Sequence, residues 1–197
     1  MNTAFIGLDY IVDITHEEGK LAKGSAHVLD ETQIGRVNQT LALARSKDWL
    51  TVLVKVGFAA GYVNQPKNSP FFGGAHTAGA LALGTPGTDF HPGIRADLAD
   101  LVVVKPRVSP FYGTELEAAL RARRIERVIL GGVSTAWAVQ AAARDAHDRD
   151  YQVVVVEDLC AAATEAQHES SLELLRLIAS VVKAEELGTY ERSLPQD

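Results

Sequence analysis

Apolar residues gather along this chain in five short runs, at 3–11, 50–58, 101–105, 127–133 and 151–158. Each run is rich in β-branched residues, and most lack the regular polar alternation of a strand with one face in water. Such runs are typical of strands that are buried on both faces. A weaker run of the same kind lies at 179–184. The pattern therefore predicts five buried strands and a shorter sixth one.

Between the predicted strands lie four stripes of apolar residues at helical spacing. They are Ile34, Val37, Leu41 and Ala44; Leu116, Ala119 and Leu120; Ala136, Val139, Ala143 and Ala146; and Leu172, Leu175 and Ala179. Two of these helices begin with a capping-box pattern, in which Thr114 precedes Glu117 and Thr164 precedes Gln167. Strands that alternate with helices predict an α/β fold with a parallel sheet covered on both sides, here in a single domain over 1–197.

The stretch from 59 to 98 departs from this alternation. It holds many of the glycines and prolines and shows little periodicity, as in NQPKNSPFFGGAHTAG and LGTPGTDFHPG. So long a connection inside a compact domain is usually functional.

Composition removes several classes of function. The 197 residues carry a formal charge of −6, which argues against a nucleic-acid-binding face. The first twenty residues lack the basic start and apolar run of a signal peptide, and no run approaches the roughly 18 apolar residues of a membrane span. We therefore expect a cytoplasmic protein without nucleic-acid or membrane partners. Cys160 is the single cysteine, so an intramolecular disulfide and a cysteine-based zinc site are excluded.

Candidate chemistry follows from the rule that ligands bind outside the carboxyl ends of parallel strands. Asp9 lies late in the first predicted strand, Lys105 ends the third, and the turn GGVSTAWA at 131–138 follows the fourth. If these strands are neighbours, all three converge on one crevice. Asp9 and Lys105 then form either an acid/base pair or a structural ion pair, and their positions alone favour neither.

Glycines before a helix either present backbone N–H groups to an anion or make a simple tight turn, and both interpretations remain open for 131–138. The patterns GxGxxG, GxxxxGK[ST] and GxSxG are absent. His76 and His91 lack the partner spacing of a metal site, so we predict neither a metal nor a cofactor.

Three blocks of sequence are more specific than these single residues: VVVKPRVSPFYGTELEAAL, ILGGVSTAWAVQAAARDA and VVVVEDLCAAATEAQH. In composition, order and spacing they resemble the isochorismatase-like hydrolase superfamily. The resemblance covers nearly the whole chain and is weakest over 10–30 and 59–80. It implies a three-layer α/β/α, Rossmann-like fold with a six-stranded parallel sheet. It also implies a homodimer or a larger homo-oligomer, which the aromatic-rich segment SPFF favours as well.

Most members of that superfamily are cysteine hydrolases with a triad of aspartate, lysine and cysteine. The resemblance places the aspartate at Asp9 and the lysine at Lys105, and it places the cysteine, in the pattern GVxTxxC, at Ala138. A methyl group cannot form a covalent intermediate. We expect Cys160, in a loop after the fifth strand, to be a small buried residue rather than a displaced nucleophile.

The isochorismatases within the superfamily also lack the cysteine and hydrolyse a vinyl ether. By this resemblance Asp9 would donate a proton and water would complete the reaction. A raised pKa of Asp9 favours this role, and a charged Lys105 opposes it. Arg107 either binds a substrate carboxylate or is an ordinary surface arginine. The other expected substrate contacts are Phe58, Tyr112, Val133, Ser134 and Trp137, and the resemblance also implies a cis peptide bond between Val133 and Ser134.

These observations together predict a hydrolase without a covalent intermediate, acting on a C–O bond of a small anionic or cyclic metabolite. One alternative is a catalytically silent member of the superfamily that binds a metabolite or a protein partner. A second alternative is a C–N amidase that uses another nucleophile, such as Cys160.

Overall fold

Six parallel strands form the centre of the computed structural model, which describes residues 1–22 and 27–190. The strands are β1 (Thr3–Leu8), β2 (Leu50–Val56), β3 (Leu101–Lys105), β4 (Arg127–Val133), β5 (Gln152–Ala161) and β6 (Ser180–Val182). Their order in the sheet is β3-β2-β1-β4-β5-β6, and every neighbouring pair is parallel. The chain therefore winds outward from β1 in both directions. Such a sheet gathers the loops that follow its strands at one edge.

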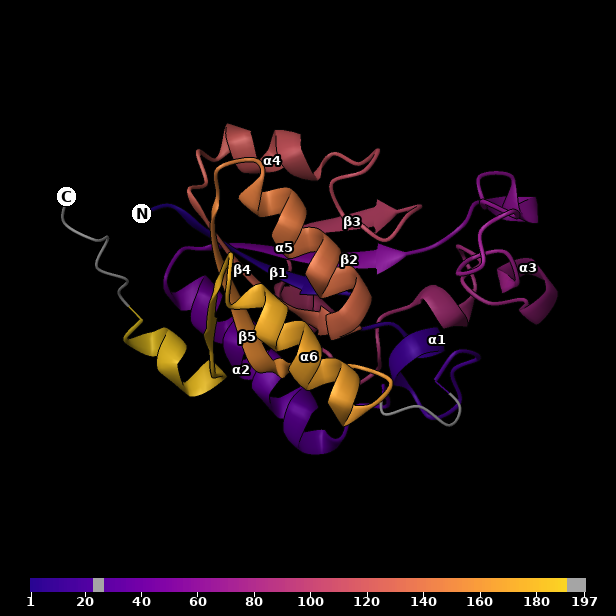
Figure 1. The fold of residues 1–197 in the computed structure, drawn as a ribbon, viewed down its shortest axis with the longest axis horizontal. Helices are drawn as coiled ribbons and strands as arrows, with labels where there is room; N and C mark the ends of the chain where they lie inside the picture. The colour runs from indigo at the N-terminus through magenta and orange to yellow at the C-terminus, as the bar shows by residue number, and fades with distance from the viewer. Residues whose placement is uncertain (23–26, 191–197) are drawn as a thin grey trace.

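Helices cover both faces of this sheet (Figure 1). The helices α4 (Leu116–Ala122), α5 (Gln140–His147) and α6 (Glu165–Leu175) lie on one face, and α2 (Glu31–Ser46) lies on the other. Two hydrophobic cores result, one on each side of the strands. The first includes Leu120, Ala143 and Leu172, and the second includes Val37 and Leu41. The predicted three-layer α/β/α fold is confirmed.

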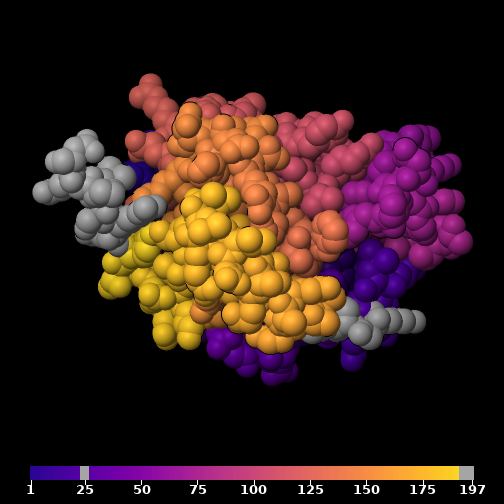
Figure 2. Space-filling view, viewed as in Figure 1, coloured from indigo at the N-terminus to yellow at the C-terminus, as the bar shows by residue number. Residues whose placement is uncertain are grey.

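The long connection after β2 lies at the end of the molecule where β2 and β3 finish (Figure 1), and Figure 2 shows that it forms the surface there. It contains α3 (Ala75–Ala78) and three short 3-10 turns, and it faces α1 (Val12–Thr15), which follows β1. A third apolar cluster, which includes Phe58, Phe72 and Leu81, joins it to the ends of β1 and β2. Asp13, which is buried in α1, accepts a hydrogen bond from the Leu81 amide at 2.7 Å. The connection is therefore fixed against the sheet end.

Local boundaries differ from the sequence prediction at three places. The first strand ends at Leu8, because Asp9 adopts a left-handed conformation with φ of 57° and turns the chain out of the sheet. β5 is longer than predicted, since its pairing with β4 resumes after a bulge, and Cys160 pairs with Gly132. Cys160 therefore lies inside a strand and not in the loop where the sequence placed it.

The third difference is the start of α4, where the expected capping box at Thr114 does not form. The Thr114 hydroxyl accepts from the Leu116 amide, and Glu117 pairs with Arg121 and Arg149 instead of turning back. At α6, by contrast, Thr164 does accept a hydrogen bond from the Gln167 amide. Among the helices described in the structure, none is long and apolar enough to cross a membrane.

Candidate active site

A cavity of about 450 Å³ opens where β1, β3 and β4 end. Six of the residues singled out from the sequence line it: Asp9, Lys105, Val133, Ser134, Trp137 and Ala138. The strand order explains this convergence only in part, since β1 and β4 are neighbours whereas β2 separates β1 from β3. Asp9 and Lys105 meet because their side chains reach across the end of β2.

Asp9 and Lys105 form a buried ion pair at the inner wall of the cavity. Their Oδ2 and Nζ atoms lie 2.7 Å apart, and the two side chains are 4% and 2% exposed. The other carboxylate oxygen of Asp9 accepts from the Val56 amide of β2 at 2.7 Å, and Lys105 also donates to the Val108 carbonyl at 2.8 Å. Every contact that holds the pair therefore comes from backbone fixed by the sheet or by the loop after β3.

Burial and the neighbouring polar groups shift the pKa of Asp9 in opposite directions. Burial raises the pKa of the Asp9 carboxyl, while the charge of Lys105, its hydrogen bond and the Val56 amide lower it. The effect of burial is the larger, so the pKa lies above the ordinary value of 3.8. Asp9 therefore accepts a proton more readily than an exposed aspartate, which is the property that an acid catalyst needs.

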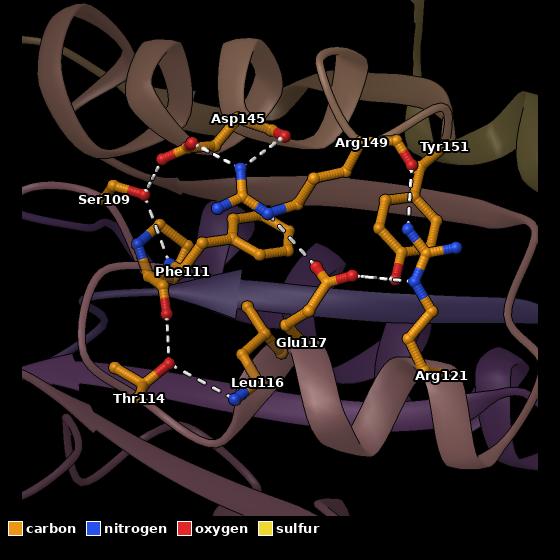
Figure 3. A network of polar contacts seen from close by, with 10 residues as sticks. Ser109, Phe111, Thr114, Leu116, Glu117, Arg121, Asp145, Arg149 and Tyr151 are labelled. Carbon is orange, nitrogen blue, oxygen red and sulfur yellow. Dashed lines mark hydrogen bonds and ion pairs between the residues drawn. The ribbon is translucent and has the colours of Figure 1, made fainter.

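The loop from Pro106 to Glu115, which supplies the Val108 carbonyl, is held by a network of polar contacts (Figure 3). The Ser109 hydroxyl donates to the carboxylate of Asp145 on α5, and Arg149 donates to the same carboxylate at 2.6 Å. Arg149 also pairs with Glu117 on α4 at 3.2 Å. The loop next to Lys105 is thus tied to two helices of the same face.

The remaining walls of the cavity are apolar and come largely from the long connection. Phe71 and Trp137 are each 51% exposed, and their ring centroids lie 4.6 Å apart, so they form part of the cavity mouth. The further apolar lining comprises Ile14, Leu21, Val56, Pro70, Phe72, Ala75, Ala78, Leu81 and Val108. Phe71 and Phe72 are not among the substrate contacts that the sequence predicts. The signal for them is the aromatic pair in SPFFGGAHTAG, a segment in which the sequence favours oligomer contacts.

Three predicted substrate contacts are not among the described residues that line the cavity. Phe58 is fully buried and packs edge-on against Phe72, with ring centroids 5.4 Å apart. Arg107 donates to the carbonyls of Asn64 and Pro106 and lies over the ring of Tyr112, which is 61% exposed. The guanidinium is therefore engaged by the loops outside the cavity.

The two histidines of the long connection also lie outside the cavity lining. His76 packs near Tyr62, and His91 lies beside His16 with ring centroids 5.1 Å apart, so His91 is less isolated than the sequence indicates. Among residues 1–22 and 27–190, no group of three histidine, cysteine, aspartate or glutamate side chains is placed to hold a metal ion. The peptide bond between Val133 and Ser134 is cis, as expected.

Cys160 lies apart from the cavity lining, inside β5. Its side chain is buried, its thiol donates to the Val156 carbonyl, and burial raises its pKa to about 12. A thiol with such a pKa is almost entirely protonated near neutral pH and is a poor nucleophile.

Comparison with known proteins agrees with this fold. The isochorismatase domain family matches residues 3–186. YecD of Escherichia coli O157:H7, an uncharacterized isochorismatase family protein, is 32% identical over 182 residues, which cover 90% of this chain and 93% of that protein. The structure of an isochorismatase family protein from Desulfovibrio vulgaris is 26% identical with a TM-score of 0.83, covering 94% of this chain and 96% of that one.

A further solved structure belongs to an enzyme of known activity. N-carbamoylsarcosine amidase from Thermoplasma acidophilum is 26% identical with a TM-score of 0.74, and the match covers 94% of this chain and 98% of that one. The family match over residues 3–186 and the structural similarity to these proteins lead to one assignment. The chain belongs to the isochorismatase family of hydrolases.

Proposed function

We propose that the protein hydrolyses a C–O bond of vinyl-ether type in a small metabolite, without a covalent enzyme intermediate. The observation that carries the proposal is the lining of the cavity. A buried carboxyl with a raised pKa and its lysine partner face the same space as Ala138, where the sequence resemblance places the family cysteine. The cavity thus offers an acid but no thiol.

In this reaction the protonated Asp9 carboxyl transfers its proton to the enol-ether carbon, and a C–H bond forms. The adjacent carbon becomes an oxocarbenium centre, which water attacks to form a new C–O bond. Asp9 takes up the proton that the water releases. The resulting hemiketal collapses as the proton of its hydroxyl passes to the leaving oxygen and the original C–O bond breaks, so the products are a ketone and an alcohol. The net change is the addition of one water molecule.

Lys105 acts at the moment when Asp9 loses its proton. An ammonium group 2.7 Å from the carboxylate stabilises the negative charge that then forms. The apolar walls keep the site poor in water and strengthen this interaction. Because the acid must be protonated at the start, the reaction is expected to slow as the pH rises through the pKa of Asp9.

The experiment is to incubate the purified protein with a pool of cellular metabolites and to follow each compound by mass spectrometry. We expect consumption of a compound whose products together carry the mass of one added water. Asp9→Asn is expected to reduce the rate about a hundredfold or more, since general acid catalysis contributes at least that factor. Cys160→Ser is the control and should keep its turnover.

Three outcomes would contradict the proposal. If the wild-type protein consumes nothing, a catalytically silent binding protein is the better account. If Cys160→Ser is folded and inactive, the reaction uses a displaced thiol. An acyl adduct in the intact-protein mass during turnover would show covalent catalysis.

A further inference from the structure

The turn that follows β4 is joined to a histidine of α6 by a buried threonine. Thr135 is fully buried and is not among the described residues that line the cavity, whereas its neighbours Ser134, Trp137 and Ala138 are. The Oγ1 atom of Thr135 lies 2.8 Å from Nδ1 of His168. This hydroxyl has no second hydrogen-bond partner among the described residues. The contact therefore connects α6 to the segment that carries three residues of the cavity.

The backbone of this turn is irregular. Thr135–Val139 form a π-helix, a form that is rare and occurs mostly as single turns at the start of or within α-helices. The Ser134 carbonyl accepts from the amides of both Trp137 and Val139, at 3.1 and 3.2 Å. Such a turn is fixed less firmly by its own backbone than the regular helix α5 that follows it. A side-chain contact at its first residue therefore helps to determine where Trp137 lies.

The helix α6 provides a firm anchor for this contact. It lies beside α5 on one face of the sheet (Figure 1), and Leu172 packs it into the core of that face. The Thr164 hydroxyl caps its first turn. A second contact joins the same two segments, because Nε2 of Gln140, the residue after the π-helix, donates to the Ser171 carbonyl at 2.9 Å. His168 thus stands on a rigid element, as a group that orients a site must.

The hydrogen bond between Thr135 and His168 has a preferred direction. The threonine hydroxyl has one hydrogen to donate, and Nδ1 of a neutral imidazole can accept it while the ring proton is on Nε2. In the reverse arrangement Nδ1 donates, and the hydroxyl hydrogen then has no acceptor among the described residues. A buried hydroxyl without an acceptor is destabilised. His168 therefore acts as the acceptor, and a replacement that lacks an acceptor at this place releases Thr135.

We propose that His168 is a positioning residue of the candidate active site, which holds Thr135 and through it sets the positions of Trp137 and Ala138 at the cavity. His168 is not among the described residues that line the cavity, so its effect on the reaction is transmitted through the turn. The inference rests on the proposed function only in taking the cavity as the site of reaction.

The test follows the indole N–H signal of Trp137 by NMR, which reports on the turn without any ligand. The chain has two tryptophans, so a Trp49→Phe variant assigns the signal. The rings of Trp137 and Phe71 have centroids 4.6 Å apart, so a small displacement of the turn changes the ring-current shift of this signal. We expect His168→Leu, which lacks an acceptor, to shift the signal. His168→Asn places an amide oxygen where Nδ1 lies and should restore it.

Thr164→Ala is the matched control, since it removes the cap of the same helix without touching Thr135. It should lower the melting temperature and leave the Trp137 signal unchanged. Thr135→Val removes the same hydrogen bond with almost no change in shape, so it carries the test if His168→Leu does not fold. The double variant Thr135→Val/His168→Leu should shift the signal no further than the single variants do, because all three lack the same contact.

Turnover separates a positioning role from a purely structural one. With the compound that is consumed in the metabolite experiment, His168→Leu is expected to lower kcat/KM at least about tenfold, since small misplacements in an active site are costly. His168→Asn should recover most of that loss. Thr164→Ala should leave kcat/KM unchanged, although it destabilises the same helix.

The inference fails if folded His168→Leu gives the wild-type Trp137 signal or wild-type turnover, if His168→Asn does not restore the signal, or if Thr164→Ala shifts it as much. Its failure is distinguishable from failure of the proposed reaction, because the NMR signal requires no substrate. A shifted signal in His168→Leu with a fully active Asp9→Asn variant would overturn only the reaction. An unshifted signal with an inactive Asp9→Asn variant would overturn only the role of His168.

Discussion

Two clusters of charged side chains lie on either side of the loop from Pro106 to Glu115, and they differ in almost every physical respect. The pair of Asp9 and Lys105 is nearly inaccessible to water, with side chains 4% and 2% exposed. The network of Glu117 on α4, Asp145 on α5 and Arg149 in the turn after α5 is drawn in Figure 3. It is half-buried, with all three side chains 34% exposed. Both clusters contain ion pairs of short distance, so distance alone does not distinguish their roles.

The difference lies in what each cluster would lose if a partner were removed. A half-buried carboxylate is resolvated by water, so each ion pair of the network adds little stability. A buried carboxylate at the cavity wall cannot be resolvated in this way. Without its partner it either remains charged, at a high cost in free energy, or takes up a proton. Burial thus converts an ordinary ion pair into a group whose protonation responds to its neighbours. The network, in contrast, ties the loop to α4 and α5.

The largest expected effect comes from breaking the buried pair. Lys105→Met leaves Asp9 without its partner and is expected to lower the free energy of unfolding by about 3–5 kcal/mol at pH 7. The double variant Asp9→Asn/Lys105→Met should recover most of this loss, because no charge then remains buried. Urea unfolding measures both. A double variant as unstable as the single one would show that packing of the lysine stem, and not charge, dominates.

The second prediction is that the loss in Lys105→Met depends on pH. The folded-state pKa of Asp9 is raised, so its contribution to stability is present at low pH and is lost as the pH rises from about 3.8 through the folded-state pKa. Removing Lys105 removes a lowering influence on that pKa and widens the window. We expect the stability gap between wild type and Lys105→Met to be smaller at pH 5 than at pH 8. The control is the double variant Asp9→Asn/Lys105→Met, which carries neither ionisable group. If the stability loss in Lys105→Met is equal at pH 5 and pH 8, the argument is contradicted.

Arg149→Met breaks the half-buried network and should have a smaller effect. The variant loses ion pairs to Glu117 and Asp145 and the contact of its guanidinium with the Phe111 ring, 4.8 Å from the centroid. We expect a loss of about 1–2 kcal/mol, which combines weak ion pairs with lost packing. Chemical unfolding at low and high salt measures it, and the loss should shrink at high salt. A loss as large as that of Lys105→Met would mean that burial does not separate the two clusters.

The smallest expected effect concerns Cys160, which belongs to neither cluster. Iodoacetamide at pH 7 should leave the folded protein unlabelled, because the thiol is buried with a pKa of about 12 and only a thiolate reacts. Intact-protein mass spectrometry before and after addition of urea measures the labelling. Rapid labelling of the folded protein would place Cys160 in an accessible site and reopen the question of a thiol nucleophile.

The sequence by itself determined the layers of this protein. Continuous apolar runs with β-branched residues favour strands buried on both faces, and stripes at helical spacing are buried against the sheet that they form. The prediction of two buried faces is wrong for β3, an edge strand in which Val102 and Val104 are 41% and 37% exposed, because the sequence does not show which strand lies at the edge. The sequence blocks around Lys105 and Ala138 also indicated the family. Together with Asp9 they indicated the candidate site. These features are local, since each depends on residues close together in the chain.

Only the tertiary structure decided how the site is completed. Asp9 and Lys105 meet across β2 because of the strand order, and the raised pKa of Asp9 depends on burial by segments distant in sequence. Phe71 reaches the cavity through a connection without periodicity, while Arg107 is held outside it by carbonyls of the neighbouring loops. Contacts of this kind join residues far apart in the chain, and neither periodicity nor motif spacing records which distant partner a side chain will find.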